Sequence, residues 1–230
     1  METTHSELTR AVSDGAGEPD RLAPWHHRAW ILCTPRSGST LLANALNAAV
    51  GVEVDRFIQC PARHVFGEHF HPNFCATWKQ FAELDPFVTK MHVHWLEERG
   101  QQMPRLSTKI IRLRRDDRVA QTWSLLSSGK VGQCHVRNSM QRAAYLSNEA
   151  HVSVTRKEFY DHFNSIERWQ RLLQLLTCTR ECLDVLYEDL VRDRARVLGQ
   201  CMEYLALPAE SWHVPTDEEI ELVAIHGLGS

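Results

Sequence analysis

The chain alternates short apolar runs with amphipathic segments along most of its length. Four runs have the length and the apolar or β-branched content of buried strands, and they lie at 29–33, 86–92, 107–114 and 182–187. Segments with apolar residues three or four positions apart predict helices over 41–49, 95–101, 116–128, 137–148 and 194–205, and a long helix that opens at 155. This alternation predicts an α/β fold with a mostly parallel central sheet, right-handed crossovers and flanking helices.

Two of these helices carry more specific signals. Thr155 and Glu158 have the spacing of a capping box, which places the start of the long helix. In the helix over 116–128, the apolar residues Val119, Trp123 and Leu126 follow helical spacing, as on the inner face of an amphipathic helix.

Composition narrows the class of protein. The 230 residues are 43% apolar and 24% charged, which suits one domain over 25–230 behind a polar leader over 1–24. A net charge of -3 argues against a nucleic-acid-coating surface, and no apolar run reaches membrane-spanning length. Seven cysteines without a C-x-x-C pair do not form a disulfide framework, so we expect a reduced, cytoplasmic protein.

The loop between the first strand and the first helix has the chemistry of an anion site. It consists of Thr34, Pro35, Arg36, Ser37, Gly38, Ser39 and Thr40. A glycine lets the backbone approach a ligand, hydroxyls donate hydrogen bonds, and an arginine adds a forked positive charge. The N–H groups and the dipole of the following helix favour a phosphate or sulfate at the same place.

Two other interpretations of this loop are weighed against an anion site. One is an ordinary strand-to-helix turn with a Ser or Thr N-cap. The other is a nucleoside-triphosphate P-loop, G-x-x-x-x-G-K-[ST], but the loop lacks the first glycine and the lysine of that motif.

A second junction with basic residues follows the strand over 107–114. Ligands of parallel sheets bind at the carboxyl ends of the strands. We therefore expect this junction and the loop after the first strand to bind one ligand together. The irregular segments 60–86 and 137–154 flank the strand ends and are the expected walls of an acceptor site. His64, His69, His71 and Cys75 lie in the first of them but match no common zinc spacing, so no metal site is predicted.

Three stretches together resemble the PAPS-dependent sulfotransferases, and more closely the bacterial group that acts on carbohydrates and glycolipids. They are the loop with its helix start (34–42), the segment 111–125, and the Leu-Tyr-Glu-Asp-Leu run at 186–190, and the likeness spans about residues 28 to 206. The resemblance implies a P-loop-like fold and transfer of a sulfuryl group from PAPS, with PAP as product. The acceptor would be a hydroxyl of a carbohydrate-like or small molecule, and a homodimer is possible.

The resemblance also assigns residues. It implies that the residues of the loop, from Thr34 to Thr40, surround the 5′-phosphosulfate, with Arg36 at the charge that develops on the leaving group. Arg115 and Ser124 would bind the 3′-phosphate, and Arg115 is preferred over Arg114 because the spacing of nine residues to Ser124 matches the bacterial group. Lys90, near a strand end, also has a counterpart in the family.

The general base is the point where the sequence departs from the family pattern. The carbohydrate group has a glutamate directly before an aromatic pair, whereas here Arg56 precedes Phe57 and Ile58. We therefore expect the base to be Asp55, with Glu53, His92 and His94 as the alternatives. Two other functions compete with this interpretation: an ATP-dependent phosphoryl-transfer enzyme on the same scaffold, and a catalytically inactive nucleotide-binding relative.

Overall fold

The structure is a computed structural model of the chain, and it describes residues 29–50, 66–67, 88–99, 109–131, 139–149 and 151–226. A five-stranded sheet runs through this part of the molecule, with every paired neighbour parallel and the strands in the order β2-β3-β1-β4-β5. The strands are β1 (Ala29–Cys33), β2 (Phe66–Gly67), β3 (Val88–His92), β4 (Lys109–Arg114) and β5 (Cys182–Leu186). The mostly parallel central sheet flanked by helices is therefore confirmed.

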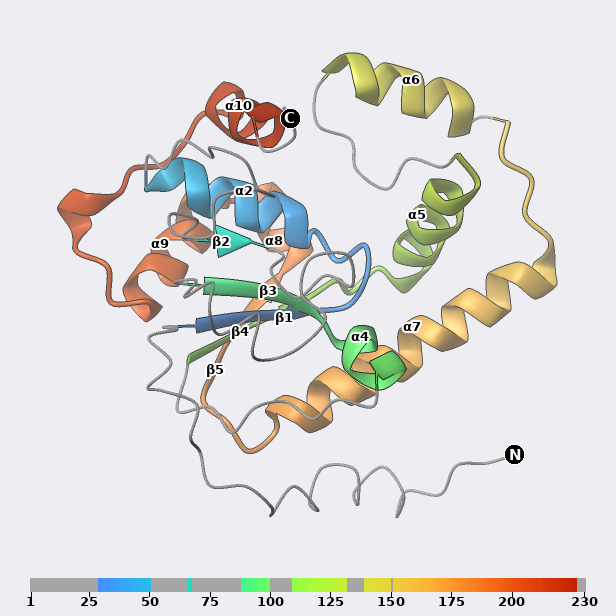
Figure 1. The fold of residues 1–230 in the computed structure, drawn as a ribbon, viewed down its shortest axis with the longest axis horizontal. Helices are drawn as coiled ribbons and strands as arrows, with labels where there is room; N and C mark the ends of the chain where they lie inside the picture. Colours follow the sequence, from blue (N-terminus) through green and yellow to red (C-terminus); the bar gives the residue numbers. More distant parts are fainter. Residues whose placement is uncertain are drawn as a thin grey trace.

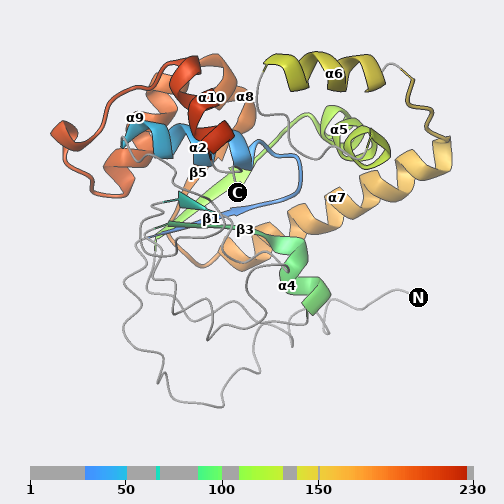
Figure 2. The ribbon, with the colours of Figure 1, turned by 45° about the horizontal axis from the view of Figure 1, so that its top comes forward.

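Helices cover both faces of the sheet (Figures 1 and 2). One face carries α2 (Ser39–Ala49), α8 (Tyr187–Arg192), α9 (Arg194–Tyr204) and α10 (Asp217–His226), and the other carries α4 (Val93–Arg99) and α7 (Arg156–Thr177). Helices α5 (Arg118–Val131) and α6 (Ser139–Glu149) lie past the end of the sheet from which β4 leaves, and a 3₁₀ turn at Ala209–Ser211 precedes α10. None of the helices in the described ranges combines the length and the apolar character needed to cross a membrane.

Strand β1 lies at the centre because its residues are apolar on both sides. All five are completely buried, as expected of a parallel strand covered on two faces. Ala29, Ile31 and Cys33 join the core beneath α2 and α9, while Trp30 and Leu32 join the second core beneath α4 and α7. The strand therefore holds the loop that follows it at the middle of the sheet, and its neighbours β3 and β4 end on either side of that loop.

The sequence did not reveal two features. Strand β2 is only two residues long and falls within the segment 60–86 that was expected to be irregular. On α5, Val119 and Trp123 are 61% and 38% exposed, and the buried residues include Gln121, Thr122, Ser127 and Ser128 beside Leu126. Two polar residues of α5, Gln121 and Ser124, contact the polar loop after β1, while Thr122, Ser127 and Ser128 donate to carbonyl groups of α5 itself.

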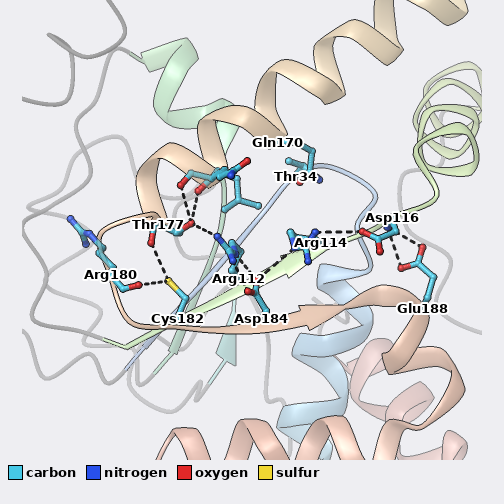
Figure 3. A network of polar contacts seen from close by, with 12 residues as sticks. Thr34, Arg112, Arg114, Asp116, Gln170, Thr177, Arg180, Cys182, Asp184 and Glu188 are labelled. Atoms are coloured by element: carbon cyan, nitrogen blue, oxygen red, sulfur yellow. Dashed lines mark hydrogen bonds and ion pairs between the residues drawn. The ribbon is translucent and has the colours of Figure 1, made fainter. Parts of the chain in front are cut away.

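A network of charged residues joins β4 to the edge strand β5 (Figure 3). Arg112 donates two hydrogen bonds of 2.5 Å to the Asp184 carboxylate and one of 3.0 Å to the Thr177 hydroxyl at the end of α7. Arg114 also reaches Asp184, at 3.6 Å, and Asp116, at 3.5 Å. Arg114 therefore belongs to the β4–β5 network, although it precedes Arg115 directly in the chain.

Candidate functional site

The loop after β1 has the backbone of a tight anion-binding turn. Gly38 is the N-cap of α2 with φ of 87°, and Arg36 also has positive φ, at 61°. A Cβ at position 38 would lie 2.3 Å from the Tyr187 ring, so only glycine fits there. The first turn of α2 contains no acidic residue, and its leading N–H groups have no acceptor within the helix.

Polar side chains beneath the loop fix its shape. The buried Thr34 hydroxyl accepts hydrogen bonds of 2.9 Å from Gln121 on α5 and from Gln170 on α7, and Gln121 also donates to the Pro35 carbonyl at 2.6 Å. The Ser37 hydroxyl donates to the Thr34 carbonyl at 2.8 Å. Thr34, Pro35 and Ser37 therefore shape the loop from inside in this structure, and sequence reasoning had assigned no role to either glutamine.

The two arginines singled out by the sequence meet at one place. The Arg36 Nε donates to the Ser124 hydroxyl on α5 at 2.9 Å, and an Arg115 Nη1 lies 3.4 Å from the Arg36 carbonyl oxygen. The Arg115 Nε is buried and has no hydrogen-bond partner among the described residues. Arg36, Arg115 and Ser124 thus form one cluster, which we call the arginine cluster, on the edge where β1 and β4 end.

Helix α8 packs its first residues against this cluster, a contribution that sequence reasoning missed. The guanidinium of Arg115 lies 4.6 Å from the centre of the Tyr187 ring, and the same ring packs on Gly38. Glu188 accepts hydrogen bonds of 3.1–3.2 Å from the backbone N–H groups of Asp116 and Asp117, and these bonds hold its pKa below the ordinary value despite burial, which raises it. The signal was present, because both residues lie in the 186–190 run.

On the other side of the loop, β3 contributes Lys90 and His92. Lys90 is 1% exposed, and its ammonium donates to the Thr40 hydroxyl in the first turn of α2 at 3.3 Å. His92 is half-buried, and its Nδ1 lies 3.8 Å from the sulfur of Cys33, the last residue of β1. The loop and the start of α2 thus lie between a lysine and a histidine of β3 and the arginine cluster.

Beyond His92, an aromatic group lies where β3 passes into α4. The rings of His92, His94 and Trp95 contact one another at 4.7–5.5 Å between centres, and His94 also contacts Trp169 of α7 at 5.0 Å. Burial and the neighbouring His92 lower the pKa of His94 to about 3, so its ring is neutral near pH 7. A histidine with so low a pKa is a poor proton acceptor at that pH.

The remaining candidates are outside the described residues. Asp55 and Glu53, expected as the base, lie there, as do His64, His69, His71 and Cys75. Within the described ranges, no group of three or more His, Cys, Asp or Glu side chains is arranged to hold a metal ion.

Comparison with known proteins shows a similarity of fold. No protein-family model matches the chain, and no curated protein matches it. Among solved structures, the chain is similar to the crystal structure of a sulfotransferase from Alicyclobacillus acidocaldarius, with 12% sequence identity and a TM-score of 0.46. The match covers 83% of this chain and 84% of that one, and at this identity it concerns the fold alone.

Proposed function

We propose that this protein is a PAPS-dependent sulfotransferase that transfers a sulfuryl group to a hydroxyl of a carbohydrate-like or small-molecule acceptor. The observation that carries the proposal is the contact between the loop after β1 and the β4–α5 junction, through Arg36, Ser124 and Arg115. Two cationic binding sites that adjoin suit one ligand with two separate phosphate-type groups. Adenosine 3′,5′-bisphosphate is such a ligand, whereas ATP lacks the 3′-phosphate.

The residues present fit this ligand. The buried Arg115 Nε has no acceptor among the described parts of the chain, and a phosphate oxygen would satisfy it. No acidic side chain opposes an anion in the first turn of α2. Arg115 and Ser124 would hold the 3′-phosphate, while Arg36, Ser39, Thr40 and the loop N–H groups would hold the 5′ end.

PAPS, when bound, supplies a sulfuryl group carried on a phosphate leaving group. Arg36 contacts Ser124 on one side of the loop and Lys90 contacts Thr40 on the other, and both positive charges would stabilise negative charge on that leaving group. The loop orients the ligand because its shape is fixed from below by Thr34, Gln121 and Gln170.

A base must also accept the proton of the acceptor hydroxyl. Of the candidates, Asp55 and Glu53 remain predictions from the sequence, whereas His92 and His94 lie among the described residues. His92 lies at the end of β3 beside the loop, and the lowered pKa of His94, about 3, makes that ring a poor proton acceptor at neutral pH. We therefore assign His92 as the base to be tested first.

Calorimetry tests the cofactor class. Adenosine 3′,5′-bisphosphate is expected to bind more tightly than ATP. The substitution Ser124→Ala should weaken the binding of the bisphosphate by about 1–2 kcal/mol, the contribution of one hydrogen bond to a charged group. Arg115→Ala should weaken it further, whereas Arg114→Ala is the matched control because Arg114 pairs with Asp184 and Asp116. A preference for ATP would support phosphoryl transfer instead and overturn the proposal.

Transfer of labelled sulfate from PAPS to a pool of acceptor alcohols tests the activity itself. The wild-type protein should label an acceptor, and Arg36→Ala should abolish the labelling. Tight binding of the bisphosphate without transfer to any acceptor would identify a nucleotide-binding relative that lacks catalysis.

A further inference from the structure

Cys33 and His92 face each other at the ends of two neighbouring strands. They are register partners in the parallel pair β1–β3, directly beside the loop (Figure 1). The Cys33 sulfur lies 3.8 Å from the His92 Nδ1 and 3.5 Å from the Met91 carbonyl oxygen. Cys33 is completely buried, so its polar neighbours, which also include Ser39, determine where its proton and its lone pairs go.

The chemistry of the two neighbours fixes the direction of both contacts. A carbonyl oxygen only accepts, so the contact with Met91 requires the thiol to donate its proton there. The sulfur then presents a lone pair to His92, and the Nδ1 must carry the hydrogen that it donates to sulfur. A neutral imidazole with hydrogen on Nδ1 has its proton-accepting lone pair on Nε2.

The surroundings of Cys33 strengthen its role as an acceptor. Burial raises the pKa of the thiol, but the charges of His92 and Lys90 and hydrogen bonds with His92 and Ser39 outweigh it and bring the pKa below the ordinary value. On its other side Cys33 has Leu113 of β4 as register partner, which offers no competing polar group.

We propose that Cys33 is a positioning residue that holds the His92 ring as the Nδ1–H tautomer and so keeps the proton-accepting lone pair on Nε2. The role in catalysis rests on the proposed sulfuryl transfer, with His92 as the base. The pairing itself does not depend on any activity, because it concerns only the state of the ring in the folded chain.

Nitrogen NMR of the full chain labelled with ¹⁵N-histidine tests the pairing directly. His92→Gln identifies the His92 signals among the 13 histidines. The wild-type ring, when neutral, should carry its hydrogen on Nδ1, Cys33→Ala should lose this preference, and Cys33→Ser should keep it because a hydroxyl oxygen also accepts. An Nε2–H tautomer in the wild-type protein would overturn the proposal without any variant.

Cys201 provides the matched control. It is also completely buried, but burial alone determines its state and raises the pKa of its thiol to about 12. Cys201→Ser should therefore leave the His92 signals unchanged. If it altered them as Cys33→Ala does, the effect would reflect general loosening of the core, and the specific pairing would be refuted.

Kinetics then separates the pairing from the proposed function. With PAPS and an acceptor, Cys33→Ala should lower kcat/KM by about tenfold, the scale seen when a functional histidine loses the partner of its second ring nitrogen. It should also shift the acid limb of the pH profile, and Cys33→Ser should restore most of the loss. An Nδ1–H tautomer without transfer would overturn the proposed function alone, whereas full activity in Cys33→Ala would overturn the positioning role alone.

Discussion

At the scale of single residues, Gly38 is the position of the loop where no other side chain fits. It combines a left-handed backbone with direct packing against Tyr187, and the same ring stacks on Arg115. Any side chain at position 38 must therefore displace the ring that orients Arg115. A substitution at position 38 should therefore also alter the position of Arg115 in the arginine cluster.

Gly38→Ala is expected to lower the free energy of unfolding by about 1–2 kcal/mol from the backbone alone, because an L-residue is strained in the left-handed region. Displacement of Tyr187 should add to this loss of stability, and it should also weaken the binding of the bisphosphate. Urea unfolding and calorimetry measure the two effects.

Gly129→Ala is the control for this substitution. Gly129 lies within α5, and no atom of the described residues lies within 4 Å of its would-be Cβ, so alanine there should stabilise the helix by roughly 0.5–1 kcal/mol. If both alanine variants behaved alike, the close packing assigned to Gly38 would be wrong.

At the scale of elements, the start of α7 depends on one carboxylate. Glu158 accepts hydrogen bonds from the Thr155 N–H and hydroxyl at 2.7 and 2.8 Å, and it pairs with Lys130 near the end of α5 at 2.9 Å. These contacts, led by the Thr155 N–H, lower the pKa of Glu158 to about 2. The capping box predicted from the sequence is confirmed, and it also ties α7 to α5.

Glu158→Gln should destabilise the protein at neutral pH but not in strong acid. Because the folded state lowers the pKa of this carboxyl, its contribution is present above the ordinary pKa of a glutamate and is lost as the pH falls towards about 2. The difference in free energy of unfolding between wild type and variant, measured by urea unfolding from pH 7 downwards, should therefore shrink. Lys157→Ala, at an exposed i,i+4 pair in the same turn, is the control and should show little effect at any pH.

The edge strand β5 depends on Asp184 in a comparable way. The carboxylate accepts from Arg112 and lies beside Arg114, and these two guanidinium groups hold its pKa below the ordinary value although burial opposes them. Asp184→Asn should lower the free energy of unfolding by about 1 kcal/mol, a modest value because the pair is partly exposed. Differential scanning calorimetry checks this, and an unchanged Tm would show that β5 is held by its backbone pairing alone.

At the scale of the whole molecule, the candidate site draws on elements far apart in the chain. Binding of the bisphosphate should slow amide hydrogen exchange in the loop 34–40 and at the junction 114–124 together, because Arg36 and Ser124 are already in contact. Mass spectrometry of the exchanged peptides measures both regions at once, with ATP as the comparison ligand. Protection of one region without the other would mean that the two do not share a ligand.

The sequence predicted the parts of this arrangement that depend on local patterns. The apolar run of β1, the glycine of the loop and the acid–threonine spacing of the capping box each have a local physical cause, and each element forms where it was expected. Arg115 was preferred over Arg114, and in the structure Arg115 contacts the loop while Arg114 pairs with Asp116 and Asp184.

The parts that were missed depend on contacts between distant segments. Gln121 and Gln170 read as ordinary polar helix residues until the fold brings both amides to Thr34. Val119 and Trp123 follow helical spacing, yet they are exposed, and α5 reaches the polar loop after β1 through Gln121 and Ser124. The contact of Tyr187 with Arg115 could not be predicted without knowing that the end of β5 lies beside the end of β4.

The central position of β1 also has a consequence for how the protein is made. β1 is synthesised before both of its hydrogen-bonding neighbours, which end only at residues 92 and 114, and the aromatic ring that packs on Gly38 comes at 187. Such long-range pairing is slow, and until it occurs the apolar run at 29–33 is exposed to the solvent and to other nascent chains. We therefore expect truncated products that end before β4 to aggregate rather than fold, so that the part of the molecule that carries the loop 34–40 cannot be obtained as a separate fragment.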